Sequence, residues 1–313
     1  MDGLVRVGTS GWNYPSGRGT WNGVFYPAAA EREKTFDELA FYAEHFNTVE
    51  VNSTFYGQPK PEIARGWAAR TPADFEFSVK LYQKFTHPKM FTAQFTRGAA
   101  PSTEADRLLD ALVKPNVSDL DDFKRGIDPL ASAGKLGALL AQFPPSFKHD
   151  NAALAYLEWL LAAFRDYVVA VELRHKTWSD NLGETLRLLK SHGAAFVQID
   201  EPKFRLSIAQ NQLPNIPTCY YMRLHGRNAA QWWTHAKAED RYNYLYSDQE
   251  VGEFAETVEA AREIVKKVYL YTNNHFSAKS VANAAMIKKQ LGEPLAGAYS
   301  EAFRAEYASV LRG

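Results

Sequence analysis

Residues 168–174 read VVAVELR, and this short run carries the clearest signal of the chain's fold. The apolar side chains of Val169, Val171 and Leu173 alternate with the charged Glu172 and Arg174. Such alternation is typical of a β-strand, because successive side chains of a strand point to opposite faces. We therefore expect one face of this strand to pack under helices and the other to carry charge inward.

Seven more runs resemble this one, and most of them also place charged or amide side chains on alternate positions. They are VRVGTS (5–10), TVEVNST (48–54), FEFSVK (75–80), LGALLAQF (136–143), AFVQID (195–200), CYYMRLHG (219–226) and KVYLYTNN (267–274). Seven stretches that can hold a helix separate the eight runs, and strands that alternate with helices pair in parallel. Eight such units in 313 residues predict an α/β protein, a (β/α)8 TIM-like barrel formed as a single domain over residues 1–313.

The composition limits the class of protein. Lys and Arg together number 36, as do Asp and Glu, so no overall charge favours nucleic acid or a membrane surface. No apolar run reaches the length of about 18 residues that a membrane helix needs, and the first residues lack a signal-peptide pattern. The lone cysteine, Cys219, excludes an internal disulfide and is expected to be a buried thiol. We expect a cytoplasmic protein whose partner is a small molecule, with neither membrane nor nucleic acid as partner; the oligomeric state is left open.

Three connections are longer than a minimal barrel needs, and each follows the C-terminal end of an expected strand. They span residues 11–34, 81–118 and 227–246, and the first and third are rich in Trp and Tyr. Barrels of this kind bind ligands at this end of the strands, and loops of this length are usually functional. We expect residues 81–118 to form an insertion and residues 227–246 an aromatic lid over a ligand, or simply a cap on the barrel mouth.

The same alternation predicts an unusually polar interior for the barrel. The side chains expected to point inward include Arg6, Ser10, Glu50, Asn52, Thr54, Glu76, Ser78, Lys80, Gln142, Glu172, Arg174, Gln198, Asp200, Tyr221, Arg223, His225, Tyr271 and Asn273. Ordinary barrels fill these positions with Val, Ile and Leu, because burial of an unpaired ion costs several kcal/mol. One interpretation is a structural lattice of ion pairs that joins Arg6, Glu50, Glu76, Arg174 and Arg223. Residues at the strand ends face the mouth, where a ligand site is the better interpretation.

Acid/base chemistry on a small substrate is the leading hypothesis for the strand ends. The expected catalytic residues are Glu172 and Asp200 as acid or base, Arg174 as the residue that orients Glu172, and His225. The expected substrate-binding residues are Trp12, Glu50, Asn52, Tyr56, Lys80, Gln142, Arg223, Arg227, Asn273, Asn274 and His275. Cations among them suit phosphate or carboxylate, and the aromatic loops suit a sugar ring. The substrate is therefore expected to be polar and either anionic or sugar-like.

Other hypotheses fit the same strand ends. A divalent-metal-dependent isomerase or phosphoesterase would use Glu50, Glu172, Asp200 and His225 as ligands. The cations interleaved with them would compete with a metal, so we expect no metal and no cofactor. A retaining glycosidase needs two carboxylates about 5 Å apart, and neither the fourth nor the seventh run ends in one. A non-catalytic barrel would bind a ligand here without turnover.

Several segments at these strand ends resemble a known family. They are VGTSGW (7–12), FNTVEVNSTFYG (46–57), FSVK (77–80), QFPPSF (142–147), VELRHKTW (171–178), YMRLHG (221–226) and YTNNHFSAKSVANA (271–284). In this order, and almost from end to end, they resemble the YecE-like proteins, a domain of unknown function that carries the number 72. The resemblance implies a TIM-like barrel without an established activity. It also implies site residues at Glu50, Asn52, Tyr56, Lys80, Gln142, Glu172, Arg174, Arg223, His225, Gly226, Asn273 and Asn274.

Overall fold

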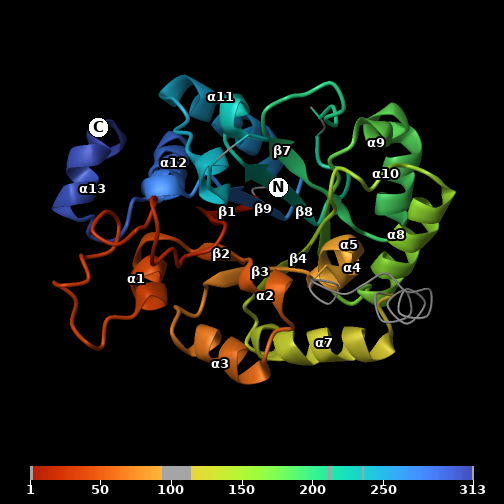
Figure 1. Cartoon of the computed structure of the whole chain (residues 1–313), viewed down its shortest axis with the longest axis horizontal. Coiled ribbons are helices and arrows are strands. Elements are labelled where there is room, and N and C mark those ends of the chain that lie inside the picture. The colour runs from red at the N-terminus through yellow and green to blue at the C-terminus, as the bar shows by residue number, and fades with distance from the viewer. Residues whose placement is uncertain (1–2, 94–113, 211–212, 235, 312–313) are drawn as a thin grey trace.

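The computed structural model describes residues 3–93, 114–210, 213–234 and 236–311, in which parallel strands are ringed by helices (Figure 1). The strands are β1 (Leu4–Thr9), β2 (Thr48–Val51), β3 (Glu76–Lys80), β4 (Leu136–Gln142), β5 (Val169–Glu172), β6 (Ala195–Phe196), β7 (Gln198–Asp200), β8 (Cys219–Leu224) and β9 (Lys267–Thr272). The α-helices are α1 (Glu38–His45), α2 (Ser53–Tyr56), α3 (Pro61–Ala69), α4 (Gln83–Thr86), α5 (Pro88–Thr92), α7 (Val117–Ser132), α8 (Asn151–Ala163), α9 (Lys176–Asp180), α10 (Leu182–Ser191), α11 (Asp248–Arg262), α12 (Lys279–Gln290), α13 (Glu301–Glu306) and α14 (Ala308–Leu311). Short 3-10 turns are η1 (Ala229–Gln231), η2 (Ala238–Tyr242) and η3 (Phe276–Ala278).

Two parallel sheets, in the orders β1-β9-β8-β7 and β2-β3-β4-β5-β6, together form the barrel. They join at a first seam between β1 and β2, where the Gly11 N–H donates to the Glu50 carbonyl oxygen over 2.8 Å. They join at a second seam within residues 195–200, because β6 pairs with β5 whereas β7 pairs with β8. The predicted (β/α)8 TIM-like barrel is confirmed, with its sixth expected strand divided into two short ones.

The first seam depends on a glycine and a tyrosine. A Cβ atom added at Gly8 would lie 2.2 Å from the Thr48 carbonyl oxygen, so only glycine lets β1 approach β2 this closely. From α1, the Tyr42 hydroxyl accepts the Thr9 N–H over 2.9 Å and donates to the Thr48 carbonyl oxygen over 3.1 Å. One hydroxyl therefore links two strands that belong to different sheets.

The second seam corrects an expectation of the sequence analysis, because the described residues between β7 and β8 form no helix. Residues 201–210 and 213–218, the described part of this connection, are irregular. Pro202, Pro214 and Pro217 interrupt it, and a proline inside a helix removes a backbone hydrogen bond. The barrel therefore lacks one covering helix in the described part of this connection.

Side-chain amides replace a missing strand partner along this seam. Gln210 accepts the Ile199 N–H and donates to the Val197 carbonyl oxygen, both over 2.7 Å. The Asn215 side chain makes the same pair of bonds nearer the start of this segment. It accepts the Phe196 N–H over 2.8 Å and donates to the Ala194 carbonyl oxygen over 2.9 Å. A primary amide offers one acceptor and two donors, so each side chain satisfies the strand backbone as a neighbouring strand would.

The apolar face of each strand packs under the helices, as the alternation predicted. The fully buried side chains on that face include Val49, Val51, Phe77, Val79, Val171 and Leu173. Capping residues fix where the covering helices begin: Asn116 and Asp119 form a capping box on α7, and Ser247 and Glu250 form another on α11. None of the helices in the described residues has the length and apolar character needed to cross a membrane.

Two of the long connections, 81–118 and 227–246, contain short helical elements of different kinds. The expected insertion 81–118 contains α4 and α5 and reaches the start of α7, while its residues 94–113 lie outside the described residues. The expected lid 227–246 contains η1 and η2, and residue 235 of it is not described. Trp232 of this segment is buried against Tyr242, with ring centres 6.5 Å apart.

Candidate functional site

A cavity of about 1160 Å³ opens at the C-terminal ends of the strands. The first and third long connections close over it, so Tyr14, Trp233 and Tyr242 share its walls with strand-end residues. The predicted site residues that line it are Trp12, Asn52, Tyr56, Lys80, Gln142, Arg174, Arg223, Asn273 and His275. The alternation of polar residues therefore identified much of one continuous surface.

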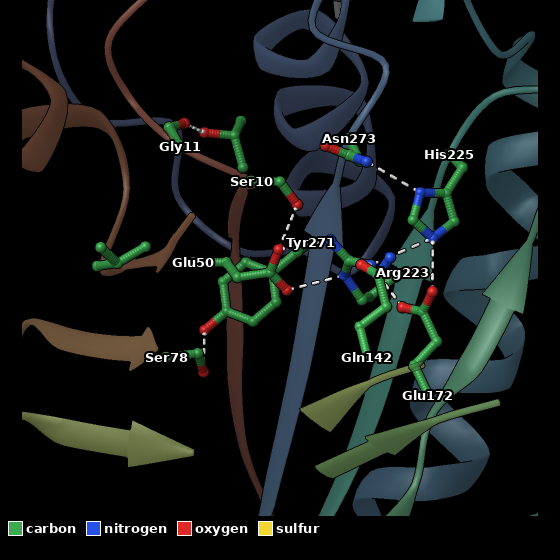
Figure 2. Close-up of polar contacts among 12 residues, drawn as sticks. Ser10, Gly11, Glu50, Ser78, Gln142, Glu172, Arg223, His225, Tyr271 and Asn273 are labelled. Carbon is green, nitrogen blue, oxygen red and sulfur yellow. Dashed lines mark hydrogen bonds and ion pairs between the residues drawn. The ribbon is translucent and has the colours of Figure 1, made fainter. Parts of the chain in front are cut away.

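Alternating charges form the base of this cavity (Figure 2). Arg223 donates to both carboxylate oxygens of Glu50, over 2.8 Å from Nε and 2.6 Å from Nη2, and its Nη1 donates to Glu172 over 2.5 Å. Arg174 donates from Nε to Glu172 over 2.7 Å and from Nη1 to Glu201 over 3.0 Å. We call these five residues the floor network: three carboxylates alternate with two guanidinium groups.

Neutral side chains complete the floor network. Glu50 also accepts the hydroxyls of Ser10 and Tyr221, each over 2.8 Å, and Gln142 accepts Arg223 Nη1 over 3.0 Å. Glu50 and Glu172 are fully buried, and charges buried in this way are tolerated only when pairing and hydrogen bonding satisfy them. Every contact described here restrains a guanidinium or a carboxylate from moving.

A second, deeper cluster surrounds Glu76. This carboxylate accepts Arg6 over 3.2 Å, Lys267 over 2.7 Å and the Tyr269 hydroxyl over 2.6 Å. Tyr271 lies between the two clusters and bonds to Ser78 over 2.9 Å. The lattice that the sequence suggested is therefore present as two separate clusters, and only the upper one reaches the cavity.

Glu172 and His225, two of the expected catalytic residues, lie beneath the cavity surface. Burial by itself would raise the pKa of Glu172, but Arg174 and Arg223 outweigh it and hold that pKa well below its usual range. Burial, together with the same two guanidinium groups, lowers the pKa of His225 to about 3. The His225 Nε2 atom lies 3.6 Å from Glu172, and Nδ1 lies 2.9 Å from the Asn273 amide. Glu172 is thus held ionised and His225 neutral, which suits a role in positioning the arginines.

Lys80 differs from the other cations of the floor. Among the described residues, no hydrogen bond or ion pair holds its ammonium group, which lies 4.1 Å from the centre of the Phe55 ring. Burial, reinforced by the charge of Arg223, lowers the pKa of Lys80 to about 7. Val51 pairs with Val79 in the β2–β3 register, so Asn52 follows β2 beside Lys80.

Asn52 and Glu201 add two further polar groups to the same cavity. The Asn52 Oδ1 atom is buried and has no hydrogen-bond partner among the described residues. Burial raises the pKa of Glu201 in spite of the opposing charge of Arg174. Glu201 was missed by the sequence analysis, which placed the inward-facing acid of this strand one residue earlier.

That placement, at Asp200, is wrong. In the β7–β8 register Gln198 pairs with Met222 and Asp200 with Leu224, and these four residues line a separate cavity against Phe254 of α11. Gln198 and Asp200 therefore point away from the barrel interior, and Ile199, which pairs with Arg223, takes the inward position. The sequence misled because the run has apolar residues on both faces.

Asp200 instead belongs to a cluster on the outer side of β7. It accepts Arg227 Nε and Nη2, each over 2.9 Å, and the Tyr246 hydroxyl over 2.7 Å. Arg227 also donates to Glu250, the capping residue of α11, over 2.8 Å. Arg227, expected to bind substrate, therefore ties the lid to this helix.

Asn274 is likewise a support for the lid. Its amide donates to the Tyr244 carbonyl oxygen over 2.7 Å and to Asn283 of α12 over 2.8 Å. Gly226, directly before the lid, has a φ of 86°, a conformation that favours glycine. Asn274 and Gly226 both matched the family motif. They support the conformation of the loop, and neither lines the cavity.

The four donors considered for a metal are not brought together as one set, although Glu172 and His225 lie 3.6 Å apart. Asp200 lies on the other side of β7 from Glu172, and the oxygens of Glu50 and Glu172 are taken up by arginine. Within the described ranges, no three His, Cys, Asp or Glu side chains are grouped so that they could hold a metal ion.

Two neutral histidines complete the cavity wall. Burial lowers the pKa of His275 to about 4, and its ring stacks on Tyr14 at 4.3 Å between centres. Burial and the nearby Lys80 lower the pKa of His87 to about 3. His87 and Tyr14 lie in the long connections, so the strand alternation carried no signal for them.

The fold and the cavity together define a TIM-like barrel protein with a polar, partly charged site at the C-terminal ends of its strands. The family model described as "Protein of unknown function DUF72" matches residues 6–305, so the chain belongs to the DUF72 family. The UPF0759 protein YunF of Bacillus subtilis (strain 168) is 27% identical over 299 residues, which cover 92% of this chain and 95% of YunF. The UPF0759 protein YecE of Escherichia coli (strain K12) is 46% identical over 84 residues, 27% of this chain and 26% of YecE.

A solved structure of a DUF72 family protein from Thermotoga maritima is 33% identical to this chain and gives a TM-score of 0.72. The match covers 93% of this chain and 100% of the Thermotoga chain. The resemblance inferred from the motifs is confirmed.

Proposed function

We propose that this protein is a metal-independent enzyme that performs acid/base chemistry on a small polar substrate carrying a phosphate or carboxylate, or on a sugar-like one. The observation that carries the proposal is a pair of cavity residues, Lys80 and Glu201, whose pKa values are displaced toward neutrality from opposite sides. Groups that gain and lose protons near the working pH are the most effective general acids and bases.

The anionic part of the substrate belongs at the two arginines of the floor network. Glu172 and Glu50 already restrain Arg174 and Arg223, so binding an anion there costs little additional side-chain entropy. One N–H of Arg174 Nη1 has no acceptor among the described residues, although Glu201 takes the other. The arginines thus supply fixed hydrogen-bond donors for an anion at the base of the cavity.

Proton transfer is assigned to Glu201, in place of Glu172. Glu172 is fully buried and bound by two guanidinium groups, so a substrate has no access to it. Glu201 lines the cavity, and burial raises its pKa, so it takes up a proton more readily than an ordinary carboxylate does. Tyr14, Tyr242 and the tryptophans of the lid exclude water from the bound substrate.

Solvent-hydrogen exchange tests this proposal directly. The purified protein would be incubated in deuterated water with a panel of sugar phosphates, sugar acids and small hydroxy and oxo acids, and the loss of substrate C–H signals followed by proton NMR. We expect deuterium to enter at least one compound, and Glu201→Gln to slow that exchange by about 100-fold or more. Glu239→Gln, which removes a different cavity carboxylate, serves as the matched control.

The outcomes separate an enzyme from a binding protein. Exchange that depends on Glu201 and not on Glu239 supports the proposal. Binding of panel compounds, measured by calorimetry, without exchange in any of them would replace the proposed enzyme with a non-catalytic ligand-binding barrel.

A further inference from the structure

The environment of Lys80 sets it apart from the buried lysines of the described chain. Lys84 is held by Asp119 over 2.7 Å, Lys135 by the carbonyl oxygens of Ala68 and Thr71 over 2.7 Å, and Lys288 by the carbonyl oxygen of His45 over 3.0 Å. Each of these ammonium groups is stabilised by oxygen acceptors, which is the usual condition for burial of a charge. Lys80, partly buried at the base of the cavity, contacts an aromatic ring instead.

The surroundings of Lys80 make its free amine accessible near neutral pH. Arg174 and Arg223 are held in place by their carboxylates. The charge of Arg223 therefore acts steadily on Lys80, although Glu172 and Glu50 oppose it in part. Burial and this repulsion lower the Lys80 pKa to about 7, against about 10.4 for an unperturbed lysine. A desolvated lysine beside other cations is the arrangement that makes an amine nucleophilic near neutral pH.

We propose that Lys80 forms an imine with a small aldehyde or ketone whose carboxylate or phosphate group is held by Arg174 and Arg223. This inference rests on the proposed function and narrows its substrate to a carbonyl compound. A carbonyl compound supplies the electrophile that a nucleophilic amine requires, and its anionic group lies at Arg174 and Arg223, the cavity cations beside Lys80.

Lys80, Glu201 and the carbonyl compound supply every proton and electron pair that the covalent step needs. The Lys80 lone pair attacks the carbonyl carbon, the C=O electron pair moves to oxygen, and transfer of a proton from nitrogen to oxygen gives a carbinolamine. The acid form of Glu201 then protonates the hydroxyl, the C–O bond breaks with release of water, and the nitrogen lone pair forms the C=N bond of a protonated imine. No oxidant or reductant is consumed.

Asn52 gives independent support for this step. Its buried Oδ1 atom has no partner among the described residues and lies in the cavity wall that follows β2, beside the end of β3. An amide oxygen left unsatisfied in this way costs free energy unless a ligand donates to it. The hydroxyl of a carbinolamine on Lys80 is such a donor.

Reductive trapping with glyoxylate tests the imine. The protein would be treated at pH 7 with glyoxylate and sodium cyanoborohydride, and the position of carboxymethyl groups found by peptide mass mapping. We expect Lys80 to be modified at least about tenfold faster than Lys190, an exposed lysine on α10, with a half-maximal rate near pH 7. Lys80→Arg keeps the positive charge and is expected to remove this modification, whereas Lys190→Arg leaves it unchanged.

Glycolate, which has the carboxylate but no carbonyl group, separates the two proposals. Its binding would be measured by calorimetry, with inorganic phosphate as a second anion. If the anions bind but Lys80 is modified no faster than Lys190, the imine is wrong and anion binding by the floor stands. If neither anion binds and Lys80 is not preferred, both the imine and the proposed anionic substrate are wrong.

Discussion

At the residue scale, Glu172 explains why the arginines of this barrel stay in place. One fully buried carboxylate accepts from both Arg174 and Arg223. Without it, Arg174 keeps only the carboxylate of Glu201 and Arg223 only that of Glu50 among the described residues. Loss of one partner from a buried ion pair leaves an uncompensated charge, which is far more costly than loss of an exposed pair.

We therefore expect Glu172→Gln to lower the free energy of unfolding by about 3–5 kcal/mol. The matched control is Asp122→Asn, which removes the same charge from an exposed pair with Arg125 at 2.9 Å and is expected to cost about 1 kcal/mol or less. Urea unfolding followed by circular dichroism measures both. Equal costs for the two variants would show that the buried pairs do not stabilise the fold as described.

At the scale of elements, the approach of β1 to β2 makes the backbone itself sensitive to one methyl group. The Cβ atom of Gly8→Ala would meet the Thr48 carbonyl oxygen at 2.2 Å, so the strands must separate. We expect a cost of about 1–3 kcal/mol or more. Gly66→Ala, in α3, meets nothing within 4 Å and is expected to stabilise the helix by about 0.5–1 kcal/mol. A lower urea midpoint for Gly8→Ala and a higher one for Gly66→Ala, each relative to the unmodified protein, would confirm the difference. An unchanged midpoint for Gly8→Ala would contradict it.

Strand alternation predicted the barrel and most of its polar lining because a regular ladder keeps the same parity from end to end. Glu50, Arg174 and Arg223 were placed correctly for that reason. The run 195–200 failed because Phe196, Val197 and Ile199 put apolar side chains on both faces, so Asp200 was chosen in place of Glu201. Alternation also predicts which face of a strand a side chain lies on, but not how far that side chain lies from the mouth of the barrel. It therefore could not show that Glu172 and His225 lie below the cavity whereas Arg174 lines it.

At the scale of the whole molecule, three buried histidines make stability depend on pH in one direction, and the raised pKa of Glu201 opposes them in part. His225, His87 and His275 have pKa values lowered to about 3, 3 and 4, chiefly by burial. Between those values and about 6.5 the unfolded chain binds more protons than the folded one, so stability falls as the pH falls. The lowered pKa of Lys80 extends the same trend from about pH 7 to about pH 10.4.

We expect the urea midpoint to decrease steadily as the pH is lowered from 6.5 to 4.5, with up to about 1.4 kcal/mol per pH unit from each histidine that stays neutral. Fluorescence-detected unfolding at fixed ionic strength measures this trend. A midpoint that is constant over this range, or that rises on acidification, would contradict the assignment of neutral buried histidines.

The floor network also has a consequence for the order of folding. Glu50, Glu172 and Arg223 belong to β2, β5 and β8, so they meet only after strands far apart in the sequence have converged. Until then each charge is hydrated, and its pairing contributes nothing to a partly folded chain. We expect Glu172→Gln to accelerate unfolding in stopped-flow experiments and to leave the refolding rate nearly unchanged; a slower refolding rate would mean that the pairs form early. The ion pairs that shape the cavity would then also govern the lifetime of the closed barrel.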